Sequence, residues 1–313
     1  MRERFRGWYR PNAAERTILW HTGIVALDAS FLLHLYRVRP RSRNRVLDLL
    51  DAVQAQLWVP HQAALEYQRN RLNVISEQDA AYEQLRAEAK KAQRQLVSGR
   101  RRHPVLEHAE FERRVDTAFG TIHQYINESE DRHPAVLGAD DDDDEIRKRL
   151  DAVLGDAVGQ PLERGDEWSE QARRRLEDEV PPGYKDWKKG KSGGDPYGDL
   201  IVWSELLEEV RSRAQDAEGG RVPVVLGVED QKEDWWRTHA GRRLGPRPEL
   251  IEEMMGAGGI PFWAYSLESF LNAGAEHLGW ELEDEDYRGF PRSSDEGEDS
   301  PLDPPPEQTH DEE

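Results

Sequence analysis

Two apolar runs in this chain end in acidic residues, and this pattern limits the folds that the chain can adopt. Residues 24–27 (IVAL) are followed by Asp28, and residues 222–228 (VPVVLGV) are followed by Glu229 and Asp230. Such short, continuous apolar runs are typical of strands buried in a parallel sheet. Because ligands of open parallel sheets bind at the carboxyl ends of the strands, we expect these acids to face one crevice.

Strand and helix patterns alternate along the rest of the chain. Residues 18–28 carry a buried strand pattern, residues 43–57 carry the stripe of an amphipathic helix, and residues 57–59 form a short strand that Pro60 stops. A long helix is expected from about residue 62 past residue 80, and another helix is expected after Asp199. A strand at 222–228 and a helix at 248–255 follow. The last expected elements are a strand at 260–265 and a helix capped by Ser266. This alternation predicts an α/β fold with a mainly parallel sheet and helices on both faces.

Composition divides the chain into three parts. Residues 1–74 and 181–280 hold the sheet pattern and are predicted to form the core. Residues 75–180 are mostly polar and rich in Glu, Gln, Arg and Ala, so they are predicted to form a helical insertion. Its acidic run at 140–145 is interpreted as a loop leading into a helix, because the acid spacing and central Gly of a calcium-binding loop are absent. Residues 281–313, with fourteen acidic residues and two Arg, are predicted to be a disordered acidic tail.

The bulk composition excludes several classes of protein. The chain has no Cys, which excludes thiol catalysis, disulfides and cysteine-bound metals. No apolar run approaches the roughly 18 residues of a membrane helix, and no signal-peptide core follows the basic start. We therefore expect a soluble, cytoplasmic protein without a membrane partner.

The net charge of −20 does not favour nonspecific nucleic-acid binding, and much of it lies in the tail. Local basic patches matter more than the total for such binding. Patches occur at residues 37–45, 100–103 and 185–191, and each is interpreted first as solvated surface charge. Charge alone thus leaves a nucleic-acid partner open.

Further acids occur where helices are expected to begin. Glu66 lies on the long helix after the second strand, and Asp195 and Asp199 lie near the start of a later helix. Singly, Asp28 could cap a helix, and Asp199 could be a helix N-terminal acid favoured by the dipole. As a set, acids at strand ends and helix starts suggest one oxygen-rich site for Mg²⁺ or Mn²⁺, and this chemistry points to phosphoester cleavage.

Six segments of the chain form a recognisable series: 28–30 (DAS), 57–67 (LWVPHQAALEY), 182–186 (PGYKD), 198–203 (GDLIVW), 229–236 (EDQKEDWW) and 265–270 (YSLESF). The chain opens with Phe5, Gly7, Trp8, Tyr9 and Pro11. Together these segments resemble the bacterial PIN-like domain family that carries a long helical insertion, and the resemblance spans roughly residues 5–272.

The resemblance implies a PIN-like fold and a site made of four acids. The metal and catalytic residues would be Asp28, Glu66, Asp199 and Asp230, with Asp195 and Glu229 as weaker candidates. Asp28 and Asp199 would hold one Mg²⁺ or Mn²⁺, and Glu66 and Asp230 would hold a second ion or orient the attacking water.

The sequence departs from the family pattern in two places. The usual Asp-Thr-Asn is Asp28-Ala29-Ser30, so Ser30 replaces an Asn that normally helps to order the site. Glu229 stands where an Asp is more usual, which leaves open whether Glu229 or Asp230 faces the metal. Ser30, Lys185 and Lys191 are candidate substrate-binding residues.

The implied activity is metal-dependent hydrolysis of phosphodiester bonds in RNA or DNA, with single strands favoured. The family suggests bacterial antiphage defence or a toxin-like effector, with a possible protein partner bound by the insertion or the acidic tail. Two alternatives remain: an inactive binding or scaffold protein of the same fold, and a phosphohydrolase acting on nucleotides.

Overall fold

A four-stranded parallel sheet lies at the centre of the computed structural model, which describes residues 1–98, 107–131, 144–189, 195–288 and 290. The strand order is β2-β1-β3-β6, and every neighbouring pair is parallel. The strands are β1 (Ile24–Leu27), β2 (Leu57–Trp58), β3 (Val222–Gly227) and β6 (Gly259–Tyr265). The predicted α/β fold class is confirmed.

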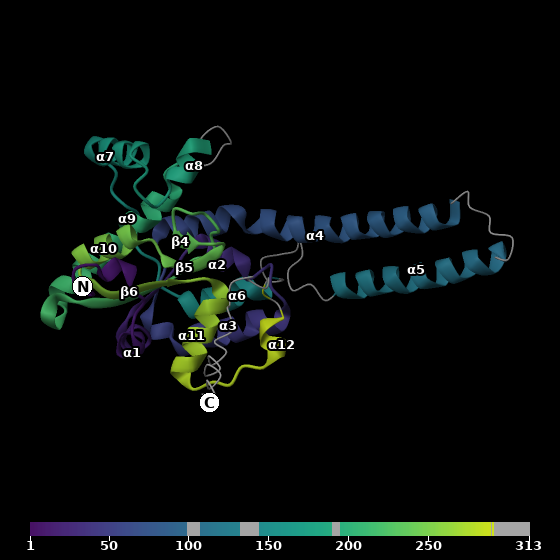
Figure 1. Cartoon of the computed structure of the whole chain (residues 1–313), viewed down its shortest axis with the longest axis horizontal. Coiled ribbons are helices and arrows are strands. Elements are labelled where there is room, and N and C mark those ends of the chain that lie inside the picture. The colour runs from purple at the N-terminus through teal and green to yellow at the C-terminus, as the bar shows by residue number, and fades with distance from the viewer. Residues whose placement is uncertain (99–106, 132–143, 190–194, 289, 291–313) are drawn as a thin grey trace, which may run out of the picture.

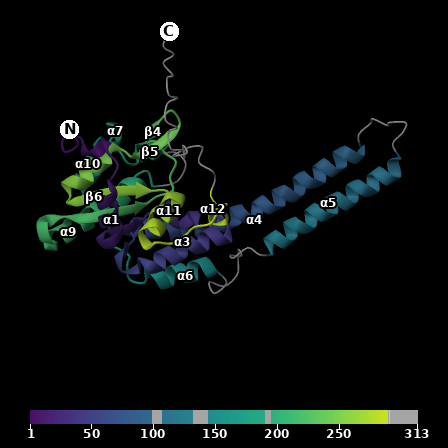
Figure 2. The same cartoon turned by 60° about the horizontal axis from the view of Figure 1, so that its bottom comes forward.

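Helices cover both faces of this sheet (Figures 1 and 2). Because successive side chains of a strand point to opposite faces, β1 sends Val25 and Leu27 into one core and Ile24 and Ala26 into the other. The helices in chain order are α1 (Ala13–Thr22), α2 (Ala29–His34), α3 (Pro40–Ala52), α4 (His61–Ser98), α5 (His108–Glu130), α6 (Glu145–Leu154), α7 (Asp166–Glu177), α8 (Tyr184–Lys189), α9 (Gly198–Asp216), α10 (Pro248–Gly256), α11 (Leu267–Leu278) and α12 (Asp284–Tyr287). Residues of α1, α2, α3, α6 and α11 pack in the first core, and those of α9 and α10 pack in the second.

Helices α4 and α5 pair along their length and project from the sheet region, as Figures 1 and 2 both show. Polar contacts join the two helices, among them Arg86 Nε to Asn127 Oδ1 at 3.1 Å and Gln93 Nε2 to Asp116 Oδ1 at 2.8 Å. Only the first part of α4 is buried in the core, through residues such as Tyr67 and Arg71. The remainder is a polar hairpin.

Two sequence expectations differ from the observed elements in their limits, and one observed element was not expected. Residues 18–22 form the end of α1 and only 24–27 form a strand, because Gly23 breaks the helix with an extended backbone. The helix expected at 43–57 runs from Pro40 to Ala52 and is followed by a 3-10 turn. An antiparallel hairpin that was not expected, β4 (Trp236–His239) and β5 (Arg242–Pro246), follows Trp235, which packs edge-to-face against Trp203.

The acidic segments expected to be loop and tail lie partly outside the described residues. Residues 140–143 and 291–313 are not described, whereas Asp144 caps the start of α6 by accepting from Arg147 N at 2.9 Å. The first residues of the expected tail form α12, whose Asp286 is buried and bound by Arg41. The division into core, insertion and tail stays a prediction. Within the described ranges, no helix is long and apolar enough to span a membrane.

Candidate active site

Asp28 lies at the carboxyl end of β1 and is almost fully buried, with 6% of its surface exposed. It caps α2, and its Oδ2 accepts hydrogen bonds from the backbone N–H of Ser30 at 2.8 Å and from the Ser30 hydroxyl. Burial raises the pKa of Asp28, and the Ser30 bonds oppose that rise because they stabilise the carboxylate. Asp28 can therefore cap α2 and also be a residue of the candidate site.

Ser30 connects the ends of the two central strands. Its hydroxyl donates to Asp28 and accepts from the backbone N–H of Glu229 at 2.9 Å. The Glu229 carboxylate in turn accepts from Leu267 N at 2.6 Å, at the start of α11. Glu229 is thus bound to the N-terminus of a helix, while its neighbour Asp230 belongs to a different cluster.

That cluster is organised by Lys232, which is 23% exposed. Its ammonium nitrogen lies 2.5 Å from Asp230 Oδ2, 2.7 Å from Asp186 Oδ2 and 3.0 Å from Asp199 Oδ2. One cation therefore serves three carboxylates from three separate segments. We call Asp186, Asp199, Asp230 and Lys232 the lysine-centred cluster.

Protonation of the cluster follows from its burial. Burial raises the pKa of Asp199 to about 7, with further contributions from the negative charges of Asp28 and Asp230, although Lys232 opposes the rise. Burial lowers the pKa of Lys232, but the attraction of its three carboxylates more than offsets this, so its pKa lies above the usual range. One ammonium shared by several carboxylates stays charged while the buried Asp199 can hold a proton near neutral pH.

Glu66 approaches the same region from α4, where Gln62 Nε2 donates to its Oε1 at 2.7 Å. Burial raises its pKa, and the charges of Asp28 and Asp195 add to the rise while Lys232 opposes it. A Cβ atom at Gly198, the first residue of α9, would lie 2.5 Å from Glu66 Oε1. The absence of a side chain at Gly198 is therefore what lets Glu66 sit against the start of α9.

Asp195 and Asp234 lie near the cluster but have other partners. The exposed Asp195 accepts from Tyr197 N at 3.0 Å and forms an ion pair with Arg164 at 3.5 Å. Asp234 is fully buried and accepts from the backbone N–H groups of Gly183 and Lys185, both at 3.1 Å. Asp234 thereby holds the loop that presents α8 and its Asp186.

Asp28 thus lies within electrostatic reach of each of the other three predicted acids, at the carboxyl edge of the sheet. The charge of Asp28 raises the pKa values of Glu66 and Asp199, and that of Asp230 raises those of Asp28 and Asp199. Among the described residues, no three acidic or His side chains are arranged tightly enough to hold a metal ion as they stand. Lys232 occupies the space between two of the predicted acids.

Sequence reasoning missed Lys232 and Asp186 as members of the site. Both lie inside segments that carried the family resemblance, at 229–236 and 182–186, and that position was the available signal. The candidate substrate residue Lys185 forms an ion pair with Glu233 at the surface, and Lys191 lies outside the described residues.

The fold is a parallel α/β sheet with acidic side chains at its carboxyl edge, which is where open sheets of this kind bind ligands. Residues 24–250 match the family model described as a PIN-like domain, and this match covers more than half of the chain. The protein belongs to the PIN-like domain family, which confirms the resemblance seen in the sequence. No curated protein and no solved structure shows significant similarity to the chain.

Proposed function

We propose that the protein is a metal-dependent nuclease that hydrolyses phosphodiester bonds in RNA or DNA, with single strands favoured. The observation that carries the proposal is the grouping of Asp28, Asp199 and Asp230 at the carboxyl edge of the sheet, where one partly exposed ammonium group pairs with Asp199 and Asp230. Membership of the PIN-like family supports it, since the family fold is of the nuclease type.

The residues present suit Mg²⁺ or Mn²⁺, which prefer carboxylate oxygens. The Lys232 ammonium stands in for a cation between Asp199 and Asp230, and this indicates that the surrounding oxygens are arranged to stabilise positive charge. Asp28, Asp199, Glu66 and Asp230 would hold the metal, with Asp195 and Glu229 at the margin. When bound, such an ion activates water and stabilises charge on the phosphate oxygens.

The chain's own residues would prepare the site in three ways. Ser30 fixes the rotamer of Asp28, and Gln62 fixes that of Glu66. Asp199 holds a proton near neutral pH and so reduces repulsion among the acids before a cation arrives. Lys232, once displaced from the carboxylates, would be free to neutralise a phosphate of the substrate.

The direct test uses Asp28→Asn and Asp199→Asn, which keep the size of the side chain and remove its charge. Cleavage of single-stranded RNA and DNA with Mn²⁺ should fall by about a hundredfold or more, because metal charge stabilisation is worth several kcal/mol. Asp216→Asn is the matched control, since Asp216 lies on the same helix as Asp199 and is exposed. Equal cleavage by Asp28→Asn and wild type would remove Asp28 from the site.

A second candidate function is nucleic-acid or protein binding without catalysis. The observation that favours it is again Lys232, because its ion pairs already neutralise part of the acidic cluster. Absence of cleavage of any polynucleotide by wild type, together with binding that survives Asp28→Asn, would select this function. Cleavage of mononucleotides but not polynucleotides would instead select a nucleotide phosphohydrolase.

The biological setting that we propose is antiphage defence or a toxin-like effector role in the cytoplasm, as the resemblance implies. The α4–α5 hairpin of the predicted insertion is the proposed surface for guiding nucleic acid or for binding a protein partner. Phage plating on cells that express wild type or Asp199→Asn measures this role. Equal protection, or equal toxicity, by both proteins would show that the acids are not needed for it.

A further inference from the structure

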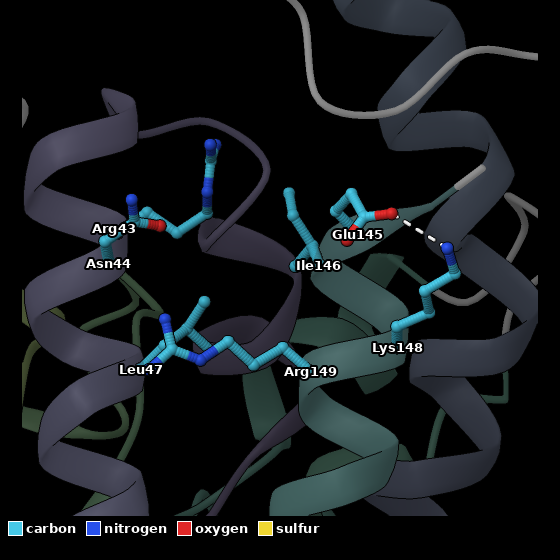
Figure 3. A pocket seen from close by; sticks show the side chains of 7 residues that line it. All are labelled: Arg43, Asn44, Leu47, Glu145, Ile146, Lys148 and Arg149. Atoms are coloured by element: carbon cyan, nitrogen blue, oxygen red, sulfur yellow. Dashed lines mark hydrogen bonds and ion pairs between the residues drawn. The ribbon is translucent and has the colours of Figure 1, made fainter. Parts of the chain in front are cut away.

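A pocket of about 430 Å³ lies between α3 and α6, and none of the proposed catalytic acids lines it (Figure 3). Figure 3 shows Arg43 reaching from α3, and Arg149 from α6, into the space between the two helices. A volume of this size falls in the range of small-molecule sites. The lining residues are Arg43, Asn44, Leu47, Glu145, Ile146, Lys148 and Arg149.

Arg43 is the unusual member of this lining. It is only 5% exposed, and no hydrogen bond or ion pair joins its guanidinium to any residue that the structure describes. Burial lowers the pKa of Arg43, which measures the cost of keeping the charge away from water. A buried cation without a partner is strongly unfavourable, and buried Arg side chains are normally paired.

The other charges around the pocket are already balanced. Lys148 Nζ lies 2.8 Å from Glu145 Oε1, and Arg149 contacts Asp48 and Asp51 at 2.5 and 2.6 Å. The negative charge of Asp144 raises the pKa of Arg43, but Asp144 itself forms a buried ion pair with Arg71. Among the described residues that line the pocket, Arg43 is therefore the cation that forms no ion pair of its own.

We propose that this pocket binds a small phosphate monoester of nucleotide size, with the Arg43 guanidinium paired to its phosphate. A guanidinium presents a planar fork that matches two phosphate oxygens, and phosphate is the anion that this geometry binds best together with carboxylate. The Asn44 amide lies one residue further along α3, and Leu47 and Ile146 provide an apolar wall for a ring.

The ligand's phosphate could be that of a free nucleotide or that of a nucleic-acid 5′ end. The shared chemistry is a dianionic monoester phosphate on a nucleoside, and size separates the two sources. A free nucleotide should bind at least as tightly as a 5′-phosphorylated tetranucleotide if the pocket is the whole site. The opposite order would assign the site to a nucleic-acid end.

Calorimetric titration of the full chain with adenosine 5′-monophosphate in metal-free buffer tests the proposal. One site is expected for wild type, with at least tenfold weaker binding of adenosine, which lacks the phosphate. Arg43→Met should weaken binding at least tenfold, and Arg43→Lys should weaken it less because it keeps the charge. Arg39→Met is the matched control, since Arg39 precedes α3 and is exposed, and it should bind within twofold of wild type.

Stability without ligand separates a ligand-binding Arg43 from a structural one. If Arg43 serves to bind an anionic ligand, the ligand-free Arg43→Met variant should be at least as stable as wild type in urea unfolding. The reason is that the substitution removes an unpaired buried charge. A clearly destabilised Arg43→Met that still binds the nucleotide as wild type does would overturn the proposal. So would failure of wild type to bind any of the phosphate ligands.

Discussion

The ammonium nitrogen of Lys232 lies 3.0 Å from Oδ2 of Asp199, the partly buried acid at the start of α9. The same nitrogen contacts Asp230 at 2.5 Å, so Lys232 bridges two of the four acids predicted to bind metal. A divalent ion held by Asp199 and Asp230 would meet this ammonium as a competitor for the same oxygens. Lys232 and a metal ion should therefore not bind Asp199 and Asp230 at the same time.

Replacing Lys232 by Met tests this exclusion. We expect Mn²⁺ affinity to rise by about tenfold, which corresponds to about 1.4 kcal/mol, because a competing cation is gone. The metal-free variant should be destabilised by about 3 kcal/mol, because the carboxylates lose their partner. Calorimetric Mn²⁺ titration and urea unfolding in EDTA measure the two effects.

Lys185→Met is the matched control for this experiment, since Lys185 pairs with Glu233 at the surface and not with the lysine-centred cluster. It should leave both the Mn²⁺ affinity and the stability near those of wild type. Weaker Mn²⁺ binding by Lys232→Met would mean that the lysine supports the metal and does not oppose it.

The raised pKa of Asp199 predicts a pH-dependent stability in the absence of metal. Its pKa is about 7 in the folded protein against an ordinary value of 3.8, so the folded state holds a proton that the unfolded chain releases. The free energy of unfolding should therefore fall as pH rises from about 4 to about 7, by up to about 4 kcal/mol for a difference of about three pH units. Lys232 adds no slope here, because its ammonium stays charged throughout.

Asp199→Asn should flatten this dependence, since Asn carries no titrating proton. Unfolding in EDTA buffers between pH 4.5 and pH 7.5, followed by denaturant titration, gives the comparison. The exposed Asp216→Asn on the same helix should keep the wild-type slope. Parallel curves for wild type and Asp199→Asn would assign the slope to other groups, such as Asp28 or Glu66.

Ser30→Ala should destabilise the protein by about 1–3 kcal/mol, because it leaves the Glu229 N–H without its acceptor and removes the hydroxyl donor to Asp28, which keeps the backbone N–H of residue 30. Urea unfolding measures the loss. Ser204→Ala is the control, because the Ser204 hydroxyl bonds only to the Leu200 carbonyl of its own helix, and it should change stability by less than about 0.5 kcal/mol. Equal effects of both changes would mean that the bridge between the strand ends is energetically unimportant.

Gly198→Ala should separate the geometry of the site from its stability. The new Cβ would lie 2.5 Å from Glu66 Oε1, which is the flexible end of a side chain, so Glu66 should move while the fold survives. We expect Mn²⁺ affinity to fall about tenfold with a stability change below about 1 kcal/mol. Gly120→Ala in α5, where a Cβ meets nothing within 4 Å, should add about 0.5–1 kcal/mol of stability without changing Mn²⁺ binding.

The sequence predicted the sheet because the apolar runs of β1 and β3 are continuous and end in acids. It misplaced the start of β1, since Leu19 and Trp20 are as apolar as the strand but belong to α1. Periodicity alone cannot tell a buried helix end from a strand. Helix α1 ends at Gly23, and whether a Gly ends a helix depends on the packing around it.

The acids of the candidate site could be predicted from the sequence, but the residues that each acid contacts could not. Asp28 and Asp199 could be named because strand ends and helix starts are visible in sequence. That Lys232 would lie among the acids, or that Glu229 would turn to cap α11, depends on side-chain directions fixed by tertiary contacts. The Arg43 pocket was not predictable, because the basic patch at 37–45 contains Arg43 but nothing in the sequence separates this residue from the exposed Arg residues beside it.

Helix α4 spans 38 residues without interruption, beginning beside the sheet with Glu66 in its second turn. At 1.5 Å per residue it is about 57 Å long. Its base is held by buried side chains such as Tyr67 and Arg71, and its far half packs against α5. The helix is therefore fixed at the end that carries the acidic site. A partner that bends its far end would displace the turn that carries Glu66.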